Sequence, residues 1–375
     1  MKIVFMCGCL EPGRDGVGDY IYRLSLELTH RSHQVKAIAL NDHYIDQEFS
    51  VNQLVTNSVF ITNRLPSIWS ATKRFDRAKD LVETFDPEWI SLQFVPFSFQ
   101  RRGLAFNLAN QLNLLAGERR WHIMFHELWV LTSFSESIKL WLLGVIQKQI
   151  IRKLIISLSP NVIHTQTRYY QEQLIRIGFK SSLLPLFSNI PISFDNKINL
   201  DISHLNYYDI KFVAFGSIHS DSLIKQFALE CASYSQSLNI KICLIFVGRS
   251  GVTQKSFANI WSSLGMEFIE FGEQSTETVS AILSSSSYGI STTPYFLIEK
   301  SGSVTAMLDH KLPVLCISKP GERLIAYSRE LVPGVYQYHE KMLATWFKSS
   351  KGKQMNTGIS VIAKRFTEDL YIGSN

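Results

Sequence analysis

The chain has 375 residues, 46% of them apolar and 19% charged, and its formal net charge is +6. This length favours two domains, and the apolar content excludes a disordered chain. The mild positive charge suits a phosphate-bearing ligand, an anionic membrane surface or a merely solvated basic face, while the lack of a dense Lys/Arg run argues against nucleic-acid binding.

The first part of the chain alternates strand and helix patterns. Residues 2–9 are an apolar run typical of a buried strand, and Ile21, Leu24 and Leu28 after it recur at helical spacing. A strand, a helix and a second strand in this order form a right-handed parallel unit, the start of a doubly wound sheet. The pattern predicts strands at 2–9, 35–40, 89–95, 122–128, 162–167 and 182–187, and helices at 19–35, 71–85, 103–117 and around 136–157.

A change of pattern separates this part from a second one. Residues 188–210 carry Pro, Asn and Asp without clear periodicity, which is typical of a linker. Alternation resumes with strands at 211–217, 241–249, 267–273, 288–294 and 313–318, and helices at 224–238, 276–286 and 303–311. We therefore expect an α/β chain of two Rossmann-like, doubly wound parallel-sheet domains facing a ligand cleft. The expected divisions are an N-terminal domain at 1–190, a linker at 191–209, a C-terminal domain at 210–350 and a closing helix within 351–375.

Cysteine usage and hydropathy indicate a cytoplasmic protein. The five cysteines (Cys7, Cys9, Cys231, Cys243 and Cys316) are odd in number and lack paired CxxC spacing, which favours small buried hydrophobes over a zinc site or a disulfide framework. The N-terminal apolar run is too short for a signal peptide. No uninterrupted apolar stretch approaches the ~18 residues that span a bilayer.

A glycine-rich loop, EPGRDGVGDY at 11–20, follows the first strand. Gly16 and Gly18 match two positions of the dinucleotide fingerprint, but the third glycine is absent and the loop begins several residues after the strand. Asp42 suits either a ribose ligand or a turn. No P-loop motif occurs. The remaining interpretations are a helix N-terminus that meets an anionic or hydroxyl-rich ligand and a simple glycine-rich helix entry.

A second cluster, TTPYFLIEKSGSVTAMLDHKLPV at 292–314, lies in the other half. Small residues at a predicted helix N-terminus beside Lys300 favour a diphosphate, because the helix dipole, the N–H groups and the ammonium all attract negative charge. Glu299 could accept hydrogen bonds from ribose or sugar hydroxyls. The alternative is an ordinary helix capped by serines.

The ordered set of motifs resembles a known family. The opening strand with GRDGVGDY, then FHELW, FVAFGS, LIFVGR and the P-x-x-x-x-E-K-S-G-S segment followed by A-M-L and L-P-V are together similar to the retaining glycosyltransferases of family 4, which have the two-domain GT-B fold. The resemblance extends over roughly 1–320. It implies a cleft that holds a nucleotide sugar against the C-terminal domain and an acceptor against the N-terminal domain.

Transferred position by position, the resemblance assigns roles to several residues. Gly16 and Gly18 would line the acceptor side and approach the donor phosphate, and His126 would lie near the transferred sugar. The donor would face Gly216, Ser217, Gly248, Arg249 and Gly272, which match the ends of the first strands of the C-terminal domain.

The sequence also departs from the family pattern. The second family glutamate would fall within 305–307, where there is no carboxylate, and the usual arginine after the first glycine of the C-terminal domain is Ser217, with Lys225 an imperfect counterpart of the family lysine. These departures leave open a non-catalytic nucleotide-sugar or glycan-binding protein on the same fold. The third functional alternative is a nicotinamide-dependent oxidoreductase.

The expected activity is metal-independent transfer of a sugar from a nucleotide diphosphate sugar, the co-substrate, to a glycan, lipid-linked or small-molecule acceptor. No other cofactor is expected, and no D-x-D acid pair of the kind that holds a metal occurs in the chain. The departing phosphate must be stabilised where its charge develops. The groups expected to do so are Lys300, Arg249 and the amides of Ser301, Gly302 and Ser303. His126 would bind the sugar, and Asp15 or Asp19 would meet the acceptor.

One stretch raises the question of membrane contact. Residues 137–158 mix Trp141, Leu142 and other apolar residues with Lys139, Lys148 and Arg152. Such a basic amphipathic pattern can seat a protein on anionic lipid, and ordinary packing against a sheet explains the apolar residues equally well. A cytoplasmic protein with peripheral contact to the inner face of the membrane is therefore one of the open alternatives.

Overall fold

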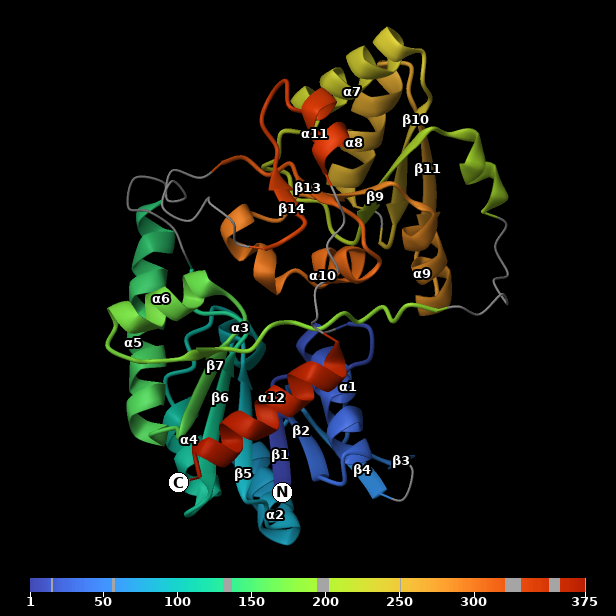
Figure 1. The fold of residues 1–375 in the computed structure, drawn as a ribbon. Coiled ribbons are helices and arrows are strands. Elements are labelled where there is room, and N and C mark those ends of the chain that lie inside the picture. The colour runs from blue at the N-terminus through green and yellow to red at the C-terminus, as the bar shows by residue number, and fades with distance from the viewer. Residues whose placement is uncertain are drawn as a thin grey trace. The chain divides into compact units, whose positions relative to one another are not determined.

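The computed structural model describes residues 1–14, 16–55, 58–130, 137–193, 202–249, 251–320, 332–350 and 358–374. The chain folds into two units (Figure 1): unit 1 comprises Met1–Pro185 and Ile359–Asn375, and unit 2 comprises Leu186–Gly358. Both are α/β units built on a mainly parallel sheet, so the predicted fold class is confirmed. The C-terminal residues belong to unit 1.

The described part of unit 1 contains an eight-stranded sheet in the order β3-β4-β2-β1-β5-β6-β7-β8. Its strands are β1 (Lys2–Cys7), β2 (Gln34–Asp42), β3 (Phe49–Val55), β4 (Ser58–Pro66), β5 (Trp89–Phe94), β6 (Arg120–Phe125), β7 (Val162–Thr165) and β8 (Ser182–Leu183). Its helices are α1 (Gly16–His30), α2 (Ala71–Phe85), α3 (Pro96–Phe99), α4 (Leu108–Ala116), α5 (Ile138–Leu158), α6 (Arg168–Arg176) and α12 (Ile359–Ile372).

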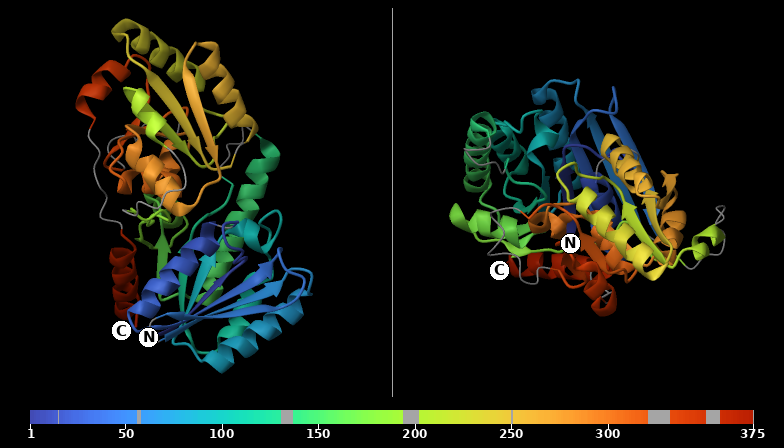
Figure 2. Two further views of the ribbon diagram at one scale, coloured as in Figure 1. Left: turned by 90° about the vertical axis from the view of Figure 1, so that its right-hand side faces the viewer. Right: turned by 90° about the horizontal axis from the view of Figure 1, so that it is seen from above.

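Helices cover both faces of this sheet. The chain runs outward from β1 to β4 and then returns to β5 on the other side of β1. Because parallel crossovers are right-handed, this reversal places α1 and α2 on opposite faces (Figure 2). Helix α12 packs beside α1, and the ring of its Phe366 stacks on Phe5 of β1 with centroids 5.7 Å apart. The C-terminal helix therefore completes the core of unit 1.

The described part of unit 2 contains a six-stranded parallel sheet in the order β11-β10-β9-β12-β13-β14. Its strands are β9 (Ile210–Phe215), β10 (Ile242–Val247), β11 (Glu267–Gly272), β12 (Tyr288–Ser291), β13 (Val314–Cys316) and β14 (Val335–Gln337). Its helices are η1 (Ser203–Tyr207), α7 (Ile224–Leu238), α8 (Val252–Ser263), α9 (Thr276–Ser285), η2 (Tyr295–Lys300), α10 (Gly302–Asp309) and α11 (Leu343–Ser349).

Two apolar clusters lie on the two faces of this sheet. Alternate residues of a strand point to opposite faces. Val213 of β9 packs with α9 and α10, whereas Phe212 of the same strand packs with α7, α8 and α11. Strand β10 is buried along its whole length. Burial on both faces gives parallel strands the continuous apolar sequence seen here.

The structure differs from the sequence-based expectations in several places, and helices α3, α6 and α11 and strand β14 are among the elements that we did not predict. Strands β3 and β4 form an antiparallel hairpin that we did not predict, and neither was α8 predicted. Helix α1 begins at Gly16, so both loop glycines lie in its first turn and not before it.

All five cysteines are buried and none forms a disulfide, as their spacing in the sequence predicts.

Candidate functional site

The reversal point of the unit 2 sheet carries a pocket of about 370 Å³. In doubly wound sheets, ligands bind at the carboxyl ends of the two strands between which the chain changes direction. Here those strands are β9 and β12, which are neighbours in the sheet. The pocket is lined by residues after both strands, among them Gly216, Ser217 and Thr293. The topology and the cavity thus indicate the same place.

Three glycines stand at the ends of adjacent strands beside this pocket. Gly216, Gly248 and Gly272 all have positive φ, at +84°, +110° and +66°. Gly216 donates its N–H to the carbonyl of Val247, and Gly248 donates to Gly272. A Cβ on Gly248 would lie 3.3 Å from the Cα and N of Gly216. The backbone can make this close turn only with glycine, which leaves the strand ends open to a ligand.

The opposite wall of the pocket is the N-terminus of α10. Ser301 caps the helix through its hydroxyl, which accepts from the N–H of Val304 and lies 3.1 Å from Ser303 Oγ. The first N–H groups of a helix have no partner within the helix. Among the described residues, the N–H groups of Gly302 and Ser303 donate to no backbone or side-chain acceptor. Both residues line the pocket, so it presents two amides and the positive end of a helix dipole.

Asn189 adds a buried polar atom to the same wall. Its Oδ1 is buried and has no hydrogen-bond partner among the described residues, and the residue lines the pocket. A buried polar atom without a partner costs about 1–3 kcal/mol. A hydroxyl-bearing ligand in the pocket would remove that cost. The sequence analysis missed Asn189 because it lies at the start of the stretch interpreted as a linker.

His219 and Thr293 also line the pocket and were not predicted. The N–H of His219 donates to Oγ1 of Thr292, which fixes the loop after β9 against the end of β12. The Thr-Thr pair directly after a predicted strand was the available sequence signal. Ser217, Gly216, Ser301, Gly302 and Ser303 were predicted, and the structure brings all five together in this lining.

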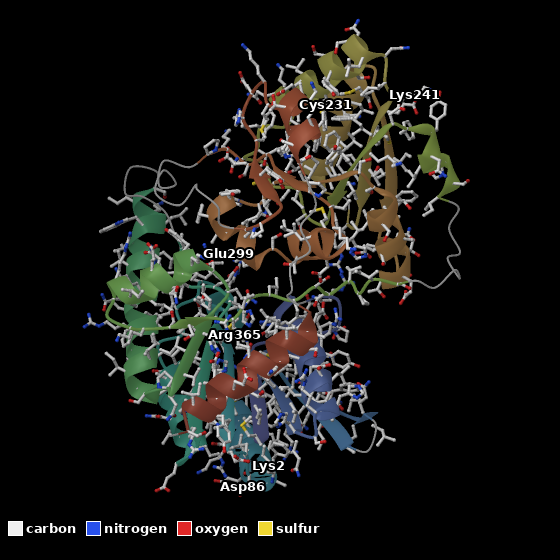
Figure 3. The ribbon with its side chains drawn as sticks, viewed as in Figure 1. Lys2, Asp86, Cys231, Lys241, Glu299 and Arg365 are labelled. Atoms are coloured by element: carbon white, nitrogen blue, oxygen red, sulfur yellow. The ribbon has the colours of Figure 1, made fainter. Side chains whose placement is uncertain are left out.

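The predicted charged groups lie near the pocket lining but outside it. Arg249 follows β10 and pairs with Glu273, which follows β11, so the two charges meet at the same edge of the sheet. Glu299, labelled in Figure 3, and Lys300 are the last residues of η2, directly before the capping serine. Both are half-buried. Their contact with a donor stays a prediction.

In unit 1, His126 follows β6 and is buried. Its Nε2 lies 2.8 Å from Oε1 of Gln93 on β5, and its ring packs edge-on against Tyr20 at 5.1 Å. Burial raises the pKa of Tyr20, which keeps that phenol protonated. His126 thus has a fixed orientation at the carboxyl end of the sheet.

Two carboxylates, those of Asp19 and Asp42, accept hydrogen bonds that hold the loop before α1 in place. Asp19 accepts the N–H of Gly13 at 3.0 Å, and Gly13 has a positive φ of +66°. Asp42 is fully buried and accepts from Arg64 and from the amides of Leu10 and Tyr44, so it anchors this loop and forms the predicted turn. Its ribose-binding alternative has no support here. Asp15 lies outside the described residues.

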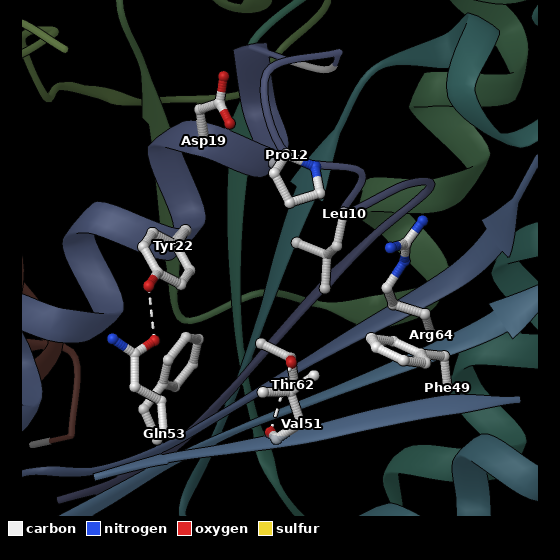
Figure 4. Close-up of a pocket in the computed structure, with 11 residues that line it drawn as sticks. Leu10, Pro12, Asp19, Tyr22, Phe49, Val51, Gln53, Thr62 and Arg64 are labelled. Atoms are coloured by element: carbon white, nitrogen blue, oxygen red, sulfur yellow. Dashed lines mark hydrogen bonds between the residues drawn. The ribbon is translucent and has the colours of Figure 1, made fainter. Parts of the chain in front are cut away.

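Unit 1 has a pocket of its own, of about 350 Å³, between α1 and the β3–β4 hairpin (Figure 4). Its lining is mainly apolar and aromatic, with Gly18 and Asp19 at one end. Two lining residues are joined by a hydrogen bond, since Tyr22 Oη donates to Gln53 Oε1 at 2.5 Å (Figure 4). Gly16 does not line it. The residues around it are Leu10, Pro12, Gly18, Asp19, Tyr22, Phe49, Val51, Gln53, Phe60, Thr62 and Arg64.

Comparison with known structures defines the class of fold. Sucrose-phosphate synthase from Thermosynechococcus elongatus matches 99% of this chain with 98% of its own length, at 13% identity and a TM-score of 0.68. The trehalose-phosphate synthase of Burkholderia xenovorans, solved with glucose-6-phosphate, matches 98% with 99% of its length, at 10% identity and a TM-score of 0.62. The chain therefore has the GT-B fold.

The same fold includes enzymes of another reaction type. UDP-GlcNAc 2-epimerase from Neisseria meningitidis, solved with UDP-GlcNAc bound, matches 99% of the chain with 100% of its own length, at 13% identity and a TM-score of 0.54. Identities of 10–13% establish the shared fold. No family model matches the sequence, and neither does any curated protein.

Proposed function

We propose that the chain is a glycosyltransferase that moves a sugar from a nucleotide diphosphate sugar to a glycan, lipid-linked or small-molecule acceptor. The observation that carries this proposal is the pocket at the reversal point of the unit 2 sheet. It combines an open glycine edge, two donor amides at a helix N-terminus and a buried amide oxygen. Two of the structural neighbours are synthases that make sugar phosphates, and a third holds UDP-GlcNAc.

The proposed chemistry follows from the leaving group. Breaking a sugar–phosphate bond places negative charge on the nucleoside diphosphate, and the N–H groups of Gly302 and Ser303 would stabilise it. Lys300 and Arg249 would add positive charge, and Glu299 would accept hydrogen bonds from ribose or sugar hydroxyls. Retention of configuration rests on the family resemblance alone, and independence from metal ions rests on the missing D-x-D acid pair.

Turnover against a panel of UDP-, GDP-, ADP- and TDP-sugars, with EDTA in parallel reactions, tests the proposal. A bound donor is expected to raise the melting temperature by mass action. Release of a nucleoside diphosphate together with formation of a new glycoside supports transfer. An unchanged rate in the reactions with EDTA supports independence from metal ions. Epimerised sugar without transfer would assign the chain to the other reaction of this fold. Binding without turnover would indicate a non-catalytic nucleotide-sugar-binding protein.

The pocket of unit 1 is the proposed acceptor contact, since Gly18 and Asp19 line it. Val51 is 41% exposed on β3, and tryptophan in its place would fill the cavity. We expect Val51→Trp to raise the KM for the acceptor about tenfold, a loss of ~1.4 kcal/mol of binding, with donor hydrolysis unchanged. Leu54→Trp on the same strand, outside the lining and 74% exposed, is the control. If the KM for the acceptor is the same in the two variants, the unit 1 pocket is not the acceptor site.

Membrane contact through α5 belongs to the same proposal, as does a cytoplasmic location. Among the described helices, none combines the length and apolarity needed to cross a bilayer. The N-terminal end of α5 exposes Leu140, Trp141 and Leu142, whereas Ile150 and Ile151 further along are buried in the core. The cluster of exposed apolar residues that could meet lipid therefore lies in the first turns of the helix.

Flotation with anionic vesicles measures this contact. The wild-type protein is expected to float with phosphatidylglycerol vesicles and not with neutral ones, and Leu142→Glu is expected to remain at the bottom of the gradient. Ile156→Glu, on the same helix and 59% exposed, is expected to float as the wild type does. Wild-type protein that fails to float would end this part of the proposal.

A further inference from the structure

A continuous chain of hydrogen bonds runs through the interior of unit 1. It starts at His126 and ends on the C-terminal helix α12. The successive distances are 2.8, 2.7, 2.7, 3.0 and 3.0 Å. Its members, in order, are His126, Gln93, Ser91, His122, His164 and Asp369.

The chain is almost entirely shielded from water. Ser91, His122 and His164 are fully buried, and Gln93 is 1% exposed. These residues come from the adjacent strands β5, β6 and β7. The terminal carboxylate, on Asp369, is 28% exposed. Polar groups at this depth are expected to satisfy one another completely.

The carboxylate end determines the direction in which every bond donates. The hydrogen bond from His164, together with the nearby charge of Arg365 on the same helix, more than offsets burial and lowers the pKa of Asp369 (Figure 3). An ionised carboxylate only accepts. His164 must therefore donate from Nε2. In the neutral form of His164, its Nδ1 then accepts from Nε2–H of His122.

The same reasoning continues to the other end. Burial lowers the pKa of His122 well below its ordinary value, so this ring is neutral. With its proton on Nε2, its Nδ1 accepts the hydroxyl proton of Ser91. The Ser91 oxygen accepts from the amide NH₂ of Gln93. The amide oxygen of Gln93 is thereby turned to His126 and accepts from its Nε2–H.

We propose that Asp369 is a positioning residue that acts through this buried chain and holds His126 in the neutral Nε2–H tautomer, with Nδ1 as the basic nitrogen of the ring. Only the assignment of a sugar contact to His126 rests on the proposed function. The tautomer itself follows from the network.

Long-range ¹H–¹⁵N NMR of histidine-labelled protein reads these tautomers directly. At pH 7 we expect His122, His126 and His164 to be neutral Nε2–H rings, each assigned by loss of its signals in a His→Gln variant. In Asp369→Asn the new side chain can donate to His164 as well as accept. We therefore expect mixed tautomers at His164 and His122, with a changed signal at His126. Glu368→Gln, the exposed neighbour on α12, is expected to leave all three unchanged.

The wild-type spectrum alone decides the proposal if the Asp369 variant does not fold. A protonated His164, or an Nδ1–H tautomer at His126, would overturn it, and so would a folded Asp369→Asn protein with unchanged tautomers. The expected tautomers in a protein without transferase activity would remove the proposed function and leave this assignment standing. If the enzyme turns over, we expect Asp369→Asn to lower kcat about tenfold with the donor KM unchanged.

Discussion

Replacing Ser303 by glutamate is expected to weaken the binding of nucleoside diphosphates by about 100-fold or more. The change places a carboxylate at the N-terminus of α10, in the lining of the unit 2 pocket. A hydrogen bond to a charged group contributes about 1.5–3 kcal/mol, and a like charge at the same place adds repulsion. Isothermal titration with UDP, GDP, ADP and TDP measures the loss.

A matched variant separates this effect from a general change of charge. Ser237→Glu adds the same charge to unit 2 near the C-terminal end of α7, at the edge of the sheet away from the pocket. Its affinity is expected to equal that of the wild-type protein. Equal weakening in both variants, or undiminished binding in Ser303→Glu, would show that the helix N-terminus does not hold the diphosphate.

Replacing Arg64 by leucine is expected to lower the free energy of unfolding by about 3–5 kcal/mol. The Arg64 side chain is 9% exposed and donates to both oxygens of Asp42, which is fully buried, and to Glu11. Removing one partner of a buried ion pair leaves an uncompensated charge. The half-buried pair between Arg77 and Glu48, whose side chains are 41% and 23% exposed, provides the control, and Arg77→Leu is expected to cost less than about 1 kcal/mol. Denaturant unfolding compares the variants.

The lowered pKa of Asp42 determines how the stability loss in Arg64→Leu depends on pH. Burial alone would raise the pKa of Asp42, but the hydrogen bonds from Arg64 and from the Tyr44 and Leu10 amides more than offset it, so the pKa lies below its ordinary value. A carboxyl with a lowered pKa stabilises the fold above its unfolded pKa and loses that contribution as the pH falls through the folded value. The difference between wild type and Arg64→Leu should therefore shrink below about pH 4. A pH-independent difference would exclude the ion pair as its source.

The parallel sheets could be predicted from the sequence because their strands are buried on both faces. Strands such as β1 and β10 read as continuous apolar runs followed by helical periodicity. The hairpin of β3 and β4 lacked such a signal, since exposed Leu54 and Val59 blur its alternation. The lining of the unit 2 pocket was largely predictable because Gly216 and Ser217 end a predicted strand and Ser301 to Ser303 stand at the start of a predicted helix.

Other residues were out of reach because their positions depend on tertiary structure. Asn189 reaches the pocket only through the path that the chain takes after β8, and no local pattern marks that path. The buried chain of hydrogen bonds joins His164 to Asp369, which are 205 residues apart in sequence. The sequence analysis therefore saw His126 as a single residue after a strand, without the partners that fix its tautomer.

The place of α12 has a consequence for the order in which the protein is made. Most of unit 1 precedes unit 2 in the chain, and domains commonly fold as they emerge from the ribosome. Yet the ring that stacks on Phe5 and the carboxylate that meets His164 are on α12, which is synthesised after all of unit 2. Part of the apolar face of unit 1 therefore stays uncovered until unit 2 and α12 have been translated. Of the two units, unit 1 begins first in the chain, and its core is completed only after unit 2 has been synthesised.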